Sequence, residues 1–99
     1  MRKIVLACVA ALSTGLMVKR MEEAAREQGY ECEIKAVPIA EVKQAAADAD
    51  IVLAGPQVRF QLEQVRGYVS CPVESIPMAD YGAMNGAKVL KMVKGVLGD

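Results

Sequence analysis

One cysteine stands where the sequence best supports covalent chemistry. Cys8 closes an apolar run over residues 4–8, and a short loop with two hydroxyl side chains, Ser13 and Thr14, follows it. The free backbone N–H groups at the start of a helix, together with the positive end of its dipole, favour a bound anion. A thiolate is such an anion, and so is a phosphoryl group carried on sulfur. The spacing therefore predicts a nucleophilic or phosphoryl-carrying thiol at Cys8.

The predicted anion-binding loop runs from Cys8 into the first turn of a helix that begins near Gly15. Its residues after the cysteine are Val9, Ala10, Ala11, Leu12, Ser13, Thr14 and Gly15. A plainer interpretation also applies, because a lone cysteine is usually an inert core residue. Ser13 and Thr14 are likewise common helix caps. The place of Cys8 between a strand and a helix favours the reactive interpretation.

The absence of histidine and the spacing of the cysteines limit the kinds of catalytic and metal site that the chain can form. The chain contains no histidine, which excludes Cys–His and Ser–His dyads and histidine metal ligands within it. Its three cysteines, Cys8, Cys32 and Cys71, are odd in number and show no CxxC spacing. This pattern supports neither a zinc site nor a disulfide framework. We expect no metal and no cofactor, and we expect Cys32 to pack in the core.

The composition is that of one small domain over residues 1–99. Of the 99 residues, 54% are hydrophobic and 24% are charged, which is enough for a packed core. Twelve basic and twelve acidic residues cancel, so no net charge attracts nucleic acid. The apolar runs are too short to span a membrane, and the first one lacks a signal-peptide cleavage site. We expect a cytoplasmic protein with no nucleic-acid binding and no direct membrane insertion.

Strand and helix patterns alternate along the chain. The expected strands cover residues 4–8, 30–36, 51–54 and 72–76, and the expected helices cover about 15–28, 38–49, 56–69 and 83–97, with a loop over 77–82. This alternation predicts an α/β fold, with an open four-stranded parallel sheet and helices on both faces. The first and third strands are apolar throughout, so they should be central. Right-handed crossovers then give the spatial order 2-1-3-4.

In a sheet of this order, the chain reverses direction between the first and third strands. Ligands bind outside the carboxyl ends of the strands at that switch point. Cys8 ends the first strand and Gln57 follows the third, so both should lie there in a phosphatase-like loop arrangement. Cysteine-dependent phosphatases, however, follow a C-x5-R pattern, and Thr14 replaces that arginine here. The loop is therefore better suited to carrying a phosphoryl group on sulfur than to transferring that group to water.

The order and spacing of several motifs resemble the lactose/cellobiose-type enzyme IIB component of the bacterial sugar phosphotransferase system (PTS). The motifs are Cys8 followed by Ser13-Thr14, the run Gly55-Pro56-Gln57-Val58-Arg59-Phe60, Asp80-Tyr81-Gly82, and Asn85-Gly86. The resemblance covers nearly the whole chain. The loop departs from the usual C-x-x-G-M-S-T-S pattern, because Ala11, Leu12 and Gly15 replace its glycine, methionine and last serine.

The resemblance implies a phosphoryl carrier, which acts as a transferase component. A phosphohistidine of a IIA component would donate to Cys8, and the phosphocysteine would donate to a sugar held by a membrane-embedded IIC component. The loop after Cys8 would cradle the phosphoryl group. The protein would then be cytoplasmic and transiently bound, through IIC, at the inner face of the membrane.

Further candidates lie outside the loop. Cleft or partner contacts are expected from Gln57, Arg59, Phe60 and Tyr81, and an apolar surface is expected around the Cys8 loop. Two other functions remain open. One is a small cysteine-dependent phosphatase or arsenate reductase with Asp80 as general acid. The other is a non-catalytic regulatory module of the IIB type.

Overall fold

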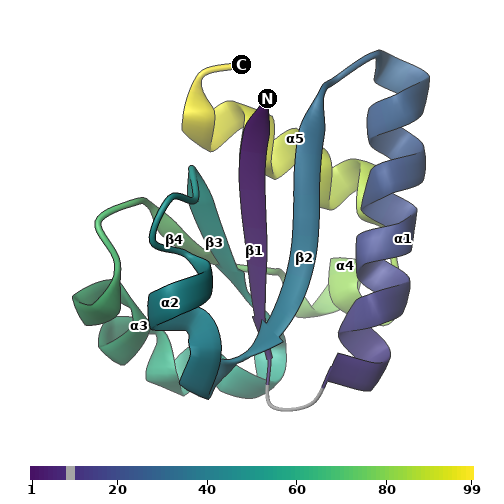
Figure 1. Cartoon of the computed structure of the whole chain (residues 1–99). Coiled ribbons are helices and arrows are strands. Elements are labelled where there is room, and N and C mark those ends of the chain that lie inside the picture. The colour runs from purple at the N-terminus through teal and green to yellow at the C-terminus, as the bar shows by residue number, and fades with distance from the viewer. Residues whose placement is uncertain (9–10) are drawn as a thin grey trace.

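The four strands form one parallel sheet in the computed structural model, which describes residues 1–8 and 11–99. The strands are β1 (Arg2–Cys8), β2 (Cys32–Pro38), β3 (Ile51–Ala54) and β4 (Val73–Ser75). Their spatial order is β2-β1-β3-β4, and every neighbouring pair is parallel (Figure 1). The predicted architecture and strand order are confirmed.

Helices cover both faces of the sheet, as predicted. The helical segments are α1 (Ala11–Gln28), η1 (Ile39–Glu41), α2 (Val42–Ala45), η2 (Pro56–Gln61), α3 (Leu62–Tyr68), α4 (Met78–Gly82) and α5 (Gly86–Leu97), where η marks a 3-10 helix. Helices α1 and α5 pack on one face, and α2 and α3 pack on the other (Figure 1). The sheet is thus shielded from water on both sides, as all-parallel sheets require.

The apolar run of β1 contributes side chains to both halves of the core. Ile4 and Leu6 point into the cluster that α1 and α5 cover, whereas Val5 and Ala7 point into the cluster that α2 and α3 cover. This alternation follows from the two-residue period of a strand. The four side chains are at most 1% exposed. An entirely apolar sequence therefore marks the centre of the sheet.

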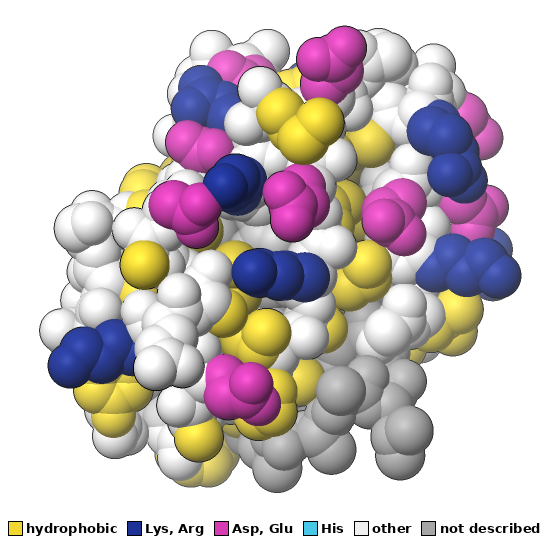
Figure 2. All heavy atoms as spheres, in the orientation of Figure 1, with side chains coloured by type: hydrophobic (Ala, Val, Ile, Leu, Met, Phe, Trp, Pro, Cys, Tyr) yellow, Lys and Arg dark blue, Asp and Glu magenta, His cyan; other side chains and the backbone are white. Residues whose placement is uncertain are grey.

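The edge strand β2 has one buried and one exposed set of side chains. Ile34 is buried, whereas Glu33 and Lys35 are exposed, which confirms the predicted alternation. Charged side chains on an edge strand disfavour pairing with another chain. On the face seen in Figure 2, charged side chains gather in the upper part, and hydrophobic ones are more frequent toward the lower edge. That lower edge carries the carboxyl ends of the strands (Figure 1).

The segment between β4 and the end of α5 differs from the prediction. Residues 77–82 were expected to form a loop, but Met78–Gly82 forms the short helix α4. Pro77, with its fixed φ of −55°, precedes the helix, and proline favours such a start. The last helix begins at Gly86 instead of Ala83, because Met84 has a φ of 50° and interrupts the helical backbone. The side chain of Asn85 then caps α5 by accepting a hydrogen bond from the backbone N–H of Lys88 at 3.1 Å.

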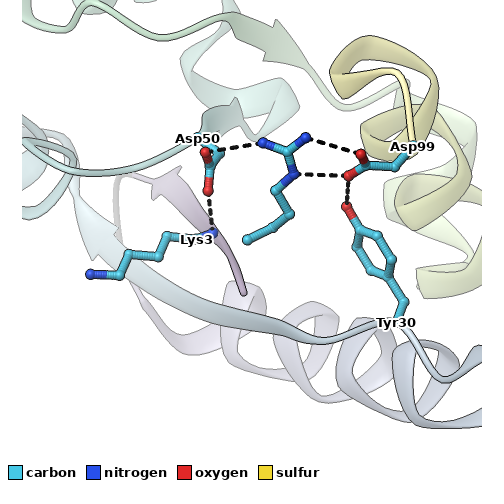
Figure 3. A network of polar contacts seen from close by, with 5 residues as sticks. Lys3, Tyr30, Asp50 and Asp99 are labelled. Carbon is cyan, nitrogen blue, oxygen red and sulfur yellow. Dashed lines mark hydrogen bonds and ion pairs between the residues drawn. The ribbon is translucent and has the colours of Figure 1, made fainter.

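A polar network joins four segments that are distant in sequence, at the amino ends of the strands (Figure 3). The guanidinium of Arg2 donates to both carboxylate oxygens of Asp99, at 2.9 and 3.0 Å, and to Asp50 at 3.3 Å. Asp50 also accepts from the backbone N–H of Lys3 at 2.8 Å, and the hydroxyl of Tyr30 donates to Asp99. The network holds the chain ends at the end of the sheet opposite Cys8 (Figure 1).

Replacing Asp99 by asparagine should reduce stability in a pH-dependent way. The hydrogen bonds from Arg2 and then from Tyr30 lower the pKa of Asp99 from 3.8 to about 2. Because the folded-state pKa is depressed, the stabilisation is present above 3.8 and is lost as the pH falls through about 2. Urea unfolding of D99N and of the original chain should therefore differ at neutral pH and converge in strong acid. E27Q, at an exposed position of α1, serves as the control; an equal loss in both variants would contradict the account.

Replacing Gly86 by alanine should separate α5 from α1. A Cβ at Gly86 would lie 2.4 Å from the backbone carbon of Arg20 and 2.5 Å from the backbone nitrogen of Met21. Neither backbone atom can move without shifting α1, and overpacking of this kind costs roughly 1–3 kcal/mol of unfolding free energy. The matched control is G95A on the same helix, where a Cβ meets nothing within 4 Å. Denaturant unfolding should show a large loss for G86A alone, and similar values for both variants would refute the packing argument.

Candidate functional site

Cys8 is the last residue of the central strand β1. Its side chain is 3% exposed, and its Sγ lies 3.4 Å from the backbone carbonyl oxygen of Val37 on β2, as a hydrogen-bond donor. The register of the sheet sets this contact, since Cys8 pairs with Pro38. The thiol is therefore held, covered, at the carboxyl edge of the sheet.

The helix that follows Cys8 begins earlier than predicted. Helix α1 starts at Ala11, so the expected loop residues from Ala11 to Gly15 belong to its first turns. Val9 and Ala10 lie outside the described residues. The first N–H groups of a helix have no partner within the helix. An anion carried by Cys8 would thus lie close in sequence to the positive end of an 18-residue helix.

The segment after β3 is hydrogen-bonded to β1 next to Cys8, as the strand order predicted. The backbone N–H of Gly55 donates to the carbonyl oxygen of Ala7 at 3.2 Å, directly before the cysteine. Segment η2 then carries Gln57 and Arg59 at this end of the sheet. Their backbone positions agree with a place near the site. Their assignment as cleft or partner contacts stays a prediction.

Exposed apolar side chains follow the carboxyl ends of two strands. Phe60, in η2 after β3, is 80% exposed, and Met78, in α4 after β4, is 64% exposed. Phe60 was expected as a cleft or partner contact, and that assignment stays a prediction. Met78 was missed because its segment was read as a loop; the Pro-Met pair directly after a strand was the available signal. Both side chains are candidates for a docking surface, and the expected apolar surface around the Cys8 loop stays a prediction.

Tyr81 and Asp80, the two candidate site residues in α4, make contacts that stabilise the fold. Tyr81 is 7% exposed and packs in the core cluster that contains Ile4 and Leu90. The side chain of Asp80 is 18% exposed, and one carboxylate oxygen lies 3.9 Å from Nζ of Lys88. The backbone carbonyl of Asp80 also accepts from the N–H of Asn85 at 2.9 Å. These contacts favour a packing role for Tyr81 and a role for Asp80 in joining α4 to α5.

The other two cysteines have surroundings that disfavour reactivity. Burial raises the pKa of the Cys32 thiol, with a smaller contribution from Glu22, and burial also raises the pKa of the Cys71 thiol. Cys32 begins β2, so the strand direction places it at the opposite end of the sheet from Cys8. Within residues 1–8 and 11–99, no three His, Cys, Asp or Glu side chains are grouped as a metal site. None of the helices described is long and apolar enough to cross a membrane.

Comparisons with known proteins agree on one family. The family model of the PTS system, lactose/cellobiose specific IIB subunit, matches residues 3–92. The galactose-specific EIIB component of Lactococcus lactis subsp. cremoris is 37% identical over 102 residues, covering 95% of this chain and 94% of that protein. The oligo-beta-mannoside-specific EIIB component of Bacillus subtilis is also 37% identical, over 100 residues, covering 98% of this chain and 97% of that protein.

Solved structures show the same fold. The lactose-specific IIB component domain of Streptococcus pneumoniae superposes with a TM-score of 0.82 over 96% of both chains, at 14% identity. The cellobiose-specific phosphotransferase IIB component of Borrelia burgdorferi gives 0.76 at 27% identity, covering 98% of this chain and 92% of that one. The family match covers the Cys8 edge of the sheet and both helical faces, and the chain belongs to the lactose/cellobiose-specific IIB subunits of the sugar phosphotransferase system.

Proposed function

We propose that the chain is a phosphoryl carrier whose acceptor is Sγ of Cys8, loaded by a phosphohistidine of a IIA component and unloaded onto a sugar held by a IIC component. The observation that carries the proposal is the place of Cys8, at the end of the central strand and directly before the start of α1. Family membership supports the transferase class, and the absence of histidine from the sequence is consistent with a histidine on the donor.

The transfer needs two in-line displacements at phosphorus. In the first, sulfur attacks, the S–P bond forms, the N–P bond breaks, and the proton released from the thiol is balanced by protonation of the departing imidazole. In the second, a sugar hydroxyl attacks, the O–P bond forms, the S–P bond breaks, and the hydroxyl proton is taken up by the departing sulfur, which regenerates the thiol. Positioning and electrostatic stabilisation are the main contributions of the protein in such reactions.

The contacts of Cys8 in the unloaded state set a requirement for the first step. Sγ of Cys8 is engaged by the Val37 carbonyl at 3.4 Å, whereas the attacking sulfur must face phosphorus. The side chain is also almost fully covered. Docking of the donor must therefore uncover Sγ and break the contact with Val37.

The exposed side chains of Phe60 and Met78 offer a surface for both partners. They follow β3 and β4 at the end of the sheet where β1 presents Cys8. Since donor and acceptor must reach the same sulfur, they would use this surface in turn. Each complex must then be weak and transient, which is typical of small interfaces. Contact with IIC would bring the chain transiently to the inner face of the membrane.

Incubation with a phosphorylated IIA donor should add one phosphoryl group to the chain. The group should be absent from C8S and present in C71S, because Cys71 is remote from the site and its burial raises the pKa of its thiol. Intact-protein mass measures the adduct, and IIC membranes with sugar should remove it. A donor that phosphorylates another IIB protein but leaves this chain unmodified would overturn the proposal and favour the regulatory module.

Removing the Phe60 side chain should slow loading without unfolding the chain. An 80% exposed ring contributes little to the core, so F60A should unfold at nearly the original denaturant concentration. Loss of an apolar contact of about 1.4 kcal/mol would lower the initial rate of transfer from IIA by about tenfold at limiting donor. The matched control is Y68A, at the far end of α3. Equal rates in F60A and the original chain would exclude Phe60 from the docking surface.

A further inference from the structure

A concave region lies along α5, the last helix of the chain. It has a volume of about 750 Å³, within the range of small-molecule sites. Its polar lining consists of Gln28, Asn85, Lys88, Lys91, Lys94 and Asp99. Phosphoryl transfer through Cys8 uses none of these residues, and α5 packs behind the sheet in the view of Figure 1.

Three lysines make this groove strongly cationic. Lys88, Lys91 and Lys94 follow one another at three-residue spacing, so they share one side of the helix. The one carboxylate in the lining, Asp99, is already bound by the guanidinium of Arg2 and the hydroxyl of Tyr30 (Figure 3). Like charges at this spacing repel one another in the empty groove. A bound anion would relieve that repulsion.

The lysines are engaged to different degrees. Nζ of Lys94 donates to Gln28 at 3.1 Å and lies 5.1 Å from the centroid of the Tyr30 ring. Nζ of Lys88 has Asp80 at 3.9 Å. Lys91, between them, is exposed and has no hydrogen-bond or ion-pair partner within the described part of the chain. Its three donors are therefore available to a ligand.

Neutral donors extend the groove beyond the size of a simple ion. The amide oxygen of Gln28 accepts from Lys94, and that of Asn85 accepts from the N–H of Lys88, which leaves both NH₂ groups for another acceptor. Gly95 and Gly98 line the groove, and a Cβ at either would meet nothing within 4 Å. The arrangement thus combines an anion site with donors suited to hydroxyl oxygens, in an open volume.

We propose that this groove binds a phosphorylated sugar, with the phosphate on Lys91 and a neighbouring lysine and the sugar hydroxyls on the amides of Gln28 and Asn85. The choice of ligand rests on the proposed function, since the relay through Cys8 produces sugar phosphates. The groove lies along α5 and Cys8 ends β1, so the site for the product is separate from the sulfur that carries the phosphoryl group. It gives the carrier a means of sensing its product.

Calorimetric titration of the folded C8S chain tests the site without phosphoryl transfer. The probes are glucose 6-phosphate, phosphorylated cellobiose, cellobiose and inorganic phosphate. We expect the sugar phosphates to bind with a Kd below about 1 mM, and K91Q to weaken that binding at least tenfold. K43Q, an exposed lysine on α2, should leave it unchanged.

Three results would overturn the site. The first is the absence of sugar-phosphate binding up to about 10 mM. The second is equally tight binding of inorganic phosphate, which would indicate an adventitious ion only. The third is sugar-phosphate binding that K91Q does not weaken. Intact mass after incubation with IIA tests the carrier role separately. Loading of Cys8 without binding in the groove would remove this inference and leave the carrier intact. Binding in the groove without loading would remove the carrier and leave the groove as a site of unassigned origin.

Discussion

The hydrogen-bonded pairing of β1 on both of its edges is the constraint on which the remaining structure depends. β1 pairs with β2 from Arg2 to Cys8 and with β3 from Ile4 to Ala7, so the residue before Cys8 is paired on both sides and Cys8 itself is paired with Pro38 of β2. All-parallel pairing requires crossover helices on both faces. The same topology brings the carboxyl ends of β1 and β3 together at the switch point. Cys8 is thus positioned by the sheet itself.

The two ends of the sheet differ in the side chains that they carry and in the contacts of those side chains. At the amino ends, Arg2, Asp50 and Asp99 are joined by hydrogen bonds and ion pairs that hold segments distant in sequence. At the carboxyl ends, Phe60 and Met78 remain exposed beside a covered thiol. The ionic contacts at the amino ends stabilise the fold at a distance from the sulfur. The exposed apolar groups are then free for docking.

Much of this arrangement could be predicted, because the strongest signals were periodic. The apolar runs of β1 and β3 identified the central strands, and the alternation in β2 identified an edge. Helix α4 was missed because five residues are too few for a helical period to show. The later start of the last helix could not be foreseen, since the positive φ of Met84 arises from the turn between α4 and α5. Nor could the sequence reveal that Cys8 donates to Val37, a contact that depends on strand register.

The most direct test of the carrier account is the ³¹P NMR spectrum of the chain after loading by a phosphorylated IIA component. The account predicts one resonance of an S-phosphorylated cysteine, assigned to Cys8, that disappears when IIC membranes and sugar are added while sugar phosphate appears. A resonance from phosphorus bound to oxygen or nitrogen of the chain would contradict it. So would an S-phosphoryl resonance that persists in the presence of an acceptor system active with another IIB protein.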